Sequence, residues 1–311
     1  MTMTMMSVEP LTFAGTMISN RARACCSLVL LAYNARRCLV SGFVRNSGLL
    51  AFNLQEVSHR PFSTTPKVAM SNEQLEVNVG ANLEEVRSRI VECCNDAGRD
   101  VTEVQLVAVS KTKPLELVKQ AYESGQRVFG ENYAQELVEK AGSIGENDII
   151  WHFIGSLQSN KANMLVKGVV PYGKLVVETV SSLKMAKKLD NAMSNFEGKL
   201  DIFVQVNTSG EESKSGVTPE EAVELCQQIT KECERVELKG VMTIGAPGDT
   251  GCLDLLATCR DEVASALDIS PKELGLSMGM SNDYDVAIAK GSTNVRVGST
   301  IFGARDYSNK K

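Results

Sequence analysis

Short apolar, β-branched runs alternate with longer amphipathic stretches from Glu73 onward. Eight runs have the length of buried strands and lie at 104–110, 127–130, 149–155, 175–179, 201–207, 238–243, 274–278 and 294–297. The stretches with helical spacing of apolar residues lie at 82–95, 114–124, 133–141, 157–166, 181–193, 219–234, 253–267 and 283–289. This alternation of strands and helices indicates βα units and a parallel sheet.

The number of these units selects among parallel-sheet folds. Eight strands with seven intervening helices in about 240 residues match a (β/α)8 barrel in size and order. An open doubly wound sheet is the competitor, but no GxGxxG sequence follows any of the strands. We therefore predict an α/β protein with a single (β/α)8 TIM barrel over residues 71–311.

The segment before Met70 differs in charge from the rest of the chain. It holds seven basic and only two acidic residues, although the whole chain has a net charge of -5. A basic, acid-poor segment is typical of an organellar transit peptide, and RPFSTT at 60–65 resembles sequence near mitochondrial processing sites. We expect residues 1–70 to be a mitochondrial transit peptide. The alternatives are a plastid leader, a disordered extension, or translation from Met70 and a cytoplasmic protein.

Composition excludes several classes of protein. The chain is 43% hydrophobic and 23% charged, which is normal for a soluble globular domain. No stretch reaches the roughly eighteen apolar residues that a membrane helix needs. Nine cysteines form no CxxC pair, and two histidines cannot complete a zinc site with them. We expect reduced, mostly buried thiols, no metal, and neither nucleic acid nor membrane as a partner.

In a TIM barrel the functional site lies at the C-terminal ends of the strands. Lys111 follows the first predicted strand, and period-2 alternation places it in phase with Val107 and Val109. If that phase faces the barrel interior, burial disfavours the charged amine and makes Lys111 a nucleophile for a Schiff base. The alternative is a lysine at a strand end that extends to solvent.

Two later loops are rich in small residues, SMGMSND at 277–283 and VRVGST at 295–300. Barrels hold phosphate after strands seven and eight, where helix N-terminal amides favour an anion. Ser281 is the expected helix N-cap, although each loop alone could be an ordinary capped turn. Arg296 lies within the last strand, so its guanidinium faces the interior or a helix and needs a partner there.

Six sequence blocks in one order carry a specific resemblance. They are AVSKTKP at 108–114, FGENY at 129–133, WHFIGSLQSNK at 151–161, SKSGV at 213–217, LSMGMS at 276–281 and VRVGSTIFGAR at 295–305. Together these blocks strongly resemble the pyridoxal phosphate homeostasis protein family, also called the proline synthetase co-transcribed homologues. The resemblance spans about residues 75–307, and the family is similar to the N-terminal barrel of alanine racemase.

The resemblance implies a cofactor, pyridoxal 5′-phosphate, and a role for particular residues. Lys111 would be the internal aldimine lysine, and Arg296 would neighbour the pyridine nitrogen. The residues implied to hold the phosphate are Ser281, Gly298 and either Ser299 or Thr300. Asn132 and His152, at the ends of strands two and three, would line the pocket or support its rim.

The implied function is to store, buffer or deliver pyridoxal phosphate through a reversible Schiff base on Lys111. Racemases of this fold add a C-terminal domain with a second base, whereas this chain ends at Lys311, soon after the barrel. Arg296 beside the ring nitrogen would also weaken the ring as an electron sink.

Other readings stay open. The enzymatic alternative is an amino-acid racemase or decarboxylase. The third class of function is an interaction protein that uses the barrel as an inert scaffold. Enzymes that need pyridoxal phosphate are candidate partners, and we expect a monomer or weak dimer. Lys214 could be a secondary docking lysine or a solvated loop residue, and Lys113 is another candidate attachment site.

Overall fold

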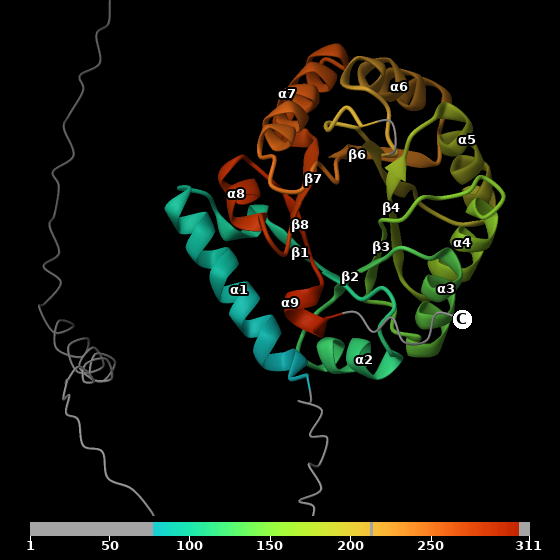
Figure 1. Ribbon diagram of the computed structural model, residues 1–311. Helices are drawn as coiled ribbons and strands as arrows, with labels where there is room; N and C mark the ends of the chain where they lie inside the picture. The colour runs from blue at the N-terminus through green and yellow to red at the C-terminus, as the bar shows by residue number, and fades with distance from the viewer. Residues whose placement is uncertain (1–76, 212–213, 305–311) are drawn as a thin grey trace, which may run out of the picture. The chain divides into compact units, whose positions relative to one another are not determined.

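Eight parallel strands close into a barrel in which each strand pairs with the next and β8 pairs with β1 (Figure 1). The computed structural model describes residues 77–211 and 214–304, so the predicted leader at 1–70 lies outside the described residues. The strands are β1 (Gln105–Val109), β2 (Val128–Glu131), β3 (Ile150–Phe153), β4 (Lys174–Val180), β5 (Leu200–Gln205), β6 (Val236–Met242), β7 (Gly275–Met280) and β8 (Asn294–Val297). The predicted (β/α)8 TIM barrel is confirmed.

Helices surround the barrel as an outer ring (Figure 1). They are α1 (Val79–Asp96), α2 (Leu115–Glu123), α3 (Ala134–Ile144), α4 (Ala162–Val169), α5 (Leu183–Ala192), α6 (Pro219–Glu232), α7 (Gly251–Ala266), α8 (Tyr284–Ala289) and α9 (Ser299–Phe302). The first helix precedes the strands and packs along α8 and α9.

Neighbouring residues of β4 and of β5 belong to different apolar clusters. Val177 and Ile202, paired on β4 and β5, belong to the main core that includes apolar residues of the surrounding helices. Val176, Phe203 and Met242 form a small separate cluster. This small cluster does not fill the barrel interior, which also holds buried polar side chains such as Arg296.

One helix differs clearly from its predicted bounds. The stretch at 157–166 predicts a helix, but α4 begins at Ala162. Lys161 N–H donates instead to the Gln158 carbonyl, 2.8 Å away, and closes a turn before the helix.

Earlier in the same loop, a side chain at Gly155 would come within 1.9 Å of the Asn132 carbonyl oxygen, so the close approach of the β2 and β3 ends requires glycine.

Two further features bear on the class of protein. Among the residues that the structure describes, no helix is both long and apolar enough to cross a membrane. The six described cysteines are free and buried, as expected. Burial raises the pKa of Cys226 and of Cys259 to about 12, which keeps both thiols protonated and unreactive.

Candidate functional site

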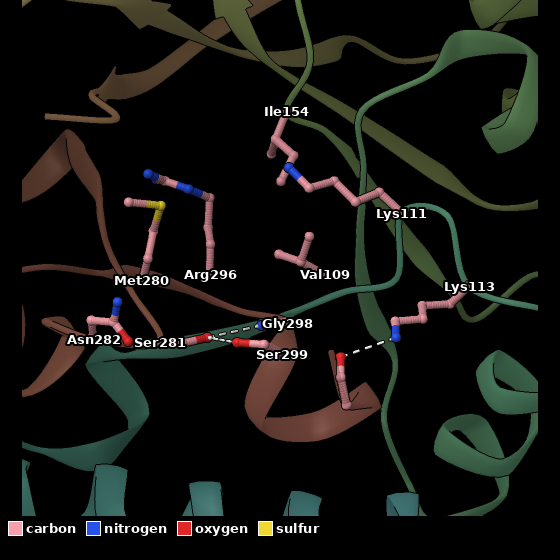
Figure 2. Close-up of a pocket in the computed structure, with 11 residues that line it drawn as sticks. Val109, Lys111, Lys113, Ile154, Met280, Ser281, Asn282, Arg296, Gly298 and Ser299 are labelled. Carbon is pink, nitrogen blue, oxygen red and sulfur yellow. Dashed lines mark hydrogen bonds between the residues drawn. The ribbon is translucent and has the colours of Figure 1, made fainter. Parts of the chain in front are cut away.

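A pocket of about 250 Å³ opens at the C-terminal ends of β1, β3, β7 and β8. Because β7, β8 and β1 are neighbours in the barrel, chain segments far apart in sequence meet there. The pocket is lined by Val109, Lys111, Lys113, Ile154, Met280, Ser281, Asn282, Arg296, Gly298, Ser299 and Gly303 (Figure 2). Its size lies near the lower end of small-molecule sites, which run from about 300 to 1,000 Å³.

Strand alternation carries Lys111 into this pocket. Val109 lines the pocket, whereas Ala108 belongs to the core that includes the helices. Lys111 keeps the phase of Val109 although it lies just beyond the strand, and its side chain extends into the pocket with that of Arg296 (Figure 2). Lys113 lines the edge, where its Nζ donates to the carbonyls of Gly303, at 3.0 Å, and Ala304, at 2.6 Å.

Small polar residues from the loops after β7 and β8 form another side of the pocket. Ser281 Oγ lies 3.4 Å from both Gly298 N and Ser299 Oγ, so the two loops meet at this serine. A Cβ atom at Gly298 would lie 3.1 Å from the Val109 carbonyl oxygen, which is a tight contact. The close approach of this loop to β1 therefore favours glycine. The short helix α9 begins here, and its first amides have no partner within the helix.

The expectation that Ser281 caps a helix is wrong. The N-cap position of α8 is Asp283, two residues after Ser281. The Asp283 side chain makes no capping hydrogen bond to α8, and its Oδ1 instead accepts the Met280 N–H at 2.6 Å. Ser281 therefore lies in the loop, with its hydroxyl directed to Gly298 rather than to the first turn of α8.

Arg296 is buried in the barrel interior, and the predicted need for a partner is met. Its Nη1 donates to Ser277 Oγ at 2.6 Å, and its Nη2 donates to the Thr243 carbonyl at 2.7 Å. Ser277 Oγ donates in turn to Glu178 Oε2 at 2.6 Å, and His152 Nδ1 donates to Glu178 Oε1. A hydrogen-bonded chain of buried side chains thus runs from Arg296 to His152.

The opposite charges of Arg296 and Glu178 balance each other within this series of hydrogen-bonded side chains. Burial opposes ionisation of Glu178, but hydrogen bonds from His152 and Ser277 and the charge of Arg296 lower the pKa of Glu178. Burial lowers the pKa of Arg296, and the carboxylate of Glu178, 4.0 Å from its Nη1, opposes that effect. A guanidinium remains protonated in proteins, so Arg296 acts at the pocket as a hydrogen-bond donor and not as a base.

The structure brings together five of the eight predicted ligand residues: Lys111, Ser281, Arg296, Gly298 and Ser299. Thr300 is exposed on α9 and does not line the pocket. Asn132 and His152 do not line it either. His152 lies within β3, bonded to Glu178, and Asn132 Oδ1 is buried with no hydrogen-bond partner among the described residues.

Lys214 lies outside the pocket lining. Its Nζ donates to the Gly245 carbonyl at 2.8 Å and pairs with Glu211 at 3.0 Å.

Sequence reasoning missed the acid that pairs with Arg296. Glu178 is in phase with Val176 on β4, and an acid in an otherwise apolar strand was the available signal. It also missed a buried cluster behind the Lys111 loop, in which Lys140 pairs with Glu131 and Glu136. The spacing of Glu136 and Lys140, four residues apart on a helix, could have indicated that contact.

Comparison with known proteins places the chain in a family. Residues 82–306 match the family model described as alanine racemase, N-terminal domain. The pyridoxal phosphate homeostasis protein of Homo sapiens is 43% identical over 249 residues, which cover 76% of this chain and 90% of the human protein. The protein of the same name from Vibrio alginolyticus is 40% identical over 240 residues, 74% of this chain and 99% of its own.

Solved structures agree. PipY of Synechococcus elongatus PCC7942, with pyridoxal phosphate bound, has a TM-score of 0.60 and 31% identity, covering 72% of this chain and 100% of PipY. An alanine racemase of Clostridium difficile 630, at 17% identity and a TM-score of 0.57, shares the fold over 73% of this chain and 56% of the racemase. The chain therefore belongs to the pyridoxal phosphate homeostasis protein family, which is built on the N-terminal barrel of alanine racemase.

Proposed function

We propose that this protein binds pyridoxal 5′-phosphate in the pocket, holds it through a reversible Schiff base on Lys111, and releases it to enzymes that need it. The observation that carries the proposal is the joint placement of Lys111 and the small polar loops after β7 and β8 in one pocket. The names of the curated relatives and the ligand in the PipY structure support the same ligand.

The residues at the pocket fit a phosphorylated aldehyde. Ser281 and Ser299 offer hydroxyl groups, and the absence of a side chain at Gly298 keeps the backbone of the loop open to an anion. Arg296 presents a guanidinium that can donate to a ring nitrogen.

A bound pyridoxal phosphate supplies an aldehyde carbon that forms a C=N bond with a primary amine, releases one water, and is freed again by hydrolysis. The protein has to hold the Lys111 amine in place, bind the anion firmly, and leave the attachment reversible. Arg296 keeps its proton and its charge, which Glu178 balances. It would therefore donate a hydrogen bond to the ring nitrogen without protonating it. These properties suit storage and delivery better than amino-acid turnover.

Lys111→Ala tests the covalent part of the proposal. The variant should lose the absorbance of the adduct and its trapping by borohydride, while the unfolding midpoint stays close to that of the wild type. Lys119→Ala, an exposed lysine on the following helix, is the matched control and should titrate as the wild type does. A full, reducible chromophore in Lys111→Ala would contradict the proposal.

Delivery needs a second measurement. The loaded protein should restore activity to an apoenzyme that depends on pyridoxal phosphate, even when a scavenger removes the free compound slowly. If reactivation follows only the free concentration, the protein is a store and the delivery part of the proposal fails.

A further inference from the structure

The residues on either side of Lys111 are bonded to side chains of β2 and α3, outside the pocket. Ser110 Oγ donates to Glu131 Oε1 at 2.7 Å, and the Ser110 carbonyl accepts from Lys140 Nζ at 2.8 Å. Thr112 N–H donates to Glu136 Oε1 at 2.7 Å. The turn that presents Lys111 is therefore held immediately before and after the lysine.

This turn has an unfavourable backbone conformation. Thr112 has a φ of 60°, in the left-handed region that a β-branched residue rarely adopts. Such a conformation persists only where surrounding contacts impose it. Lys113 N–H closes the turn by donating to the Ser110 carbonyl at 3.1 Å. The bond from Thr112 N–H to Glu136 is the contact from outside the turn that acts on Thr112.

The side chains behind the turn form an ionic cluster, here called the Lys140 cluster, in which Lys140 and Glu131 are buried and Glu136 is half-buried. Lys140 is 6% exposed, and its Nζ reaches Glu131 Oε1 at 2.7 Å, Glu136 Oε1 at 2.6 Å and the Ser110 carbonyl. These three acceptors use the three donors of an ammonium group. Burial raises the pKa of Glu131 to about 7, against the opposing charge of Lys140.

None of the three side chains lines the pocket. Surface ion pairs contribute little and need no special position, but a buried cluster is costly to form and its loss leaves charges without partners. The cluster can therefore affect ligand binding only by changing the conformation of the turn to which it is bonded.

We propose that the Lys140 cluster is a positioning device for Lys111: it holds the turn 110–112 in its left-handed form so that the lysine amine is directed into the pocket. The inference rests on the proposed function, since it assumes that Lys111 is the attachment lysine. Its residues are positioning residues, and the phosphate is held independently by the loops after β7 and β8.

This separation of roles gives the inference its test. If Glu136 no longer holds Thr112, the turn relaxes and Lys111 samples directions that miss the pocket. Covalent attachment then becomes slower and weaker, whereas non-covalent binding at the phosphate loops is unchanged. Pyridoxine 5′-phosphate has an alcohol in place of the aldehyde, so it reports the non-covalent part alone.

The variant is Glu136→Ala, a partly exposed position that α3 should tolerate. Its matched control is Glu139→Ala, an exposed glutamate of the same helix whose side chain accepts from Gln135. Glu136→Gln is the conservative variant, because its amide oxygen can still accept from Thr112 N–H. The rate and extent of attachment are followed by absorbance, pyridoxine 5′-phosphate affinity by calorimetry, and folding by thermal unfolding.

Glu136→Ala should attach pyridoxal phosphate roughly tenfold more slowly than Glu139→Ala, while both bind pyridoxine 5′-phosphate as the wild type does. Glu136→Gln should recover most of the rate. Equal attachment rates in Glu136→Ala and Glu139→Ala would overturn the inference, as would a parallel loss of pyridoxine 5′-phosphate binding. If the wild type itself forms no adduct, the proposed function fails together with the inference, which distinguishes the two failures.

Discussion

Arg296 and Glu178 carry opposite charges in the barrel interior, where neither can be hydrated freely. Both are nearly inaccessible, and Ser277 bridges them through two hydrogen bonds of 2.6 Å. Removing one partner of a buried pair is more damaging than replacing both, because the remaining charge has no compensation. The two residues should therefore behave as one unit.

A double-mutant cycle measures this coupling. Arg296→Met and Glu178→Leu should each lower the free energy of unfolding by about 3–5 kcal/mol, because each leaves a buried charge. The double variant should be clearly more stable than the sum of the two losses predicts, as denaturant unfolding would show. Additive losses would mean that the two charges do not depend on each other.

Glu131 should make stability depend on pH in a characteristic direction. Burial holds its pKa at about 7 in the folded state, whereas the ordinary value is 4.5. Between these values the folded chain keeps a proton that the unfolded chain has lost, so the contribution to stability is complete below pH 4.5 and is lost as pH rises through 7. The difference corresponds to about 3 kcal/mol.

Glu131→Gln removes the titration and provides the comparison. The stability of the wild type relative to this variant should fall as pH rises from 5 to 8, in denaturant unfolding at a series of pH values. If the two curves run parallel over that range, Glu131 ionises in the folded protein at its ordinary pKa.

Among the elements, the loops after β7 and β8 form the proposed anion site. Ser281→Asp places a carboxylate beside Gly298 N and Ser299 Oγ, where it would repel a phosphate dianion. Pyridoxal phosphate should bind more than tenfold less tightly, which is about 1.4 kcal/mol. Pyridoxal, which lacks the phosphate, should lose little affinity.

Ser281→Asn has nearly the same shape without the charge, and is the matched control. Its affinities for both compounds, measured by calorimetry, should stay near those of the wild type. Equal losses for pyridoxal and pyridoxal phosphate in Ser281→Asp would place the phosphate elsewhere.

The elements that could be predicted are those specified by local periodicity. All eight strands lie where the apolar runs predict them, and β8 agrees at both ends. The start of α4 was not predictable, because residues 157–161 satisfy a helical pattern but form a turn. Position at strand ends was also enough to select Lys111 and the two loops, and position within the last strand indicated that Arg296 needs a partner.

What escaped prediction depends on contacts between distant segments. Ser277 reaches Glu178 across 99 positions of sequence, and no local pattern specifies that pair. Ser281 had the right residue type for a cap, but α8 begins two residues later, with Asp283 in the N-cap position. The Lys140 cluster requires the packing of α3 against β1 and β2 before its charges meet.

At the scale of the whole molecule, the leader and the barrel should be separable. Within the part of the chain that the structure describes, the strands and the helix α1 before them begin at Val79 or later. Removal of residues 1–69 should therefore leave pyridoxal phosphate affinity and the unfolding midpoint unchanged. A truncated protein that fails to fold would show that the domain boundary is wrong.

We propose that the same segment directs import into mitochondria. A fluorescent fusion of the full chain should accumulate in the organelle, and a fusion that starts at Met70 should remain in the cytosol. Identical cytosolic distribution of the two fusions would contradict the targeting proposal. Accumulation of the full chain in plastids would show that the segment is a plastid leader instead.

The central claim is that one lysine, Lys111, holds the ligand covalently. The most direct measurement is mass spectrometry of peptides from the loaded wild-type protein after borohydride reduction, which makes the attachment permanent. We expect a single major modified peptide with the added mass on Lys111. Modification mainly at Lys113 or Lys214, or no modified lysine at all, would contradict it.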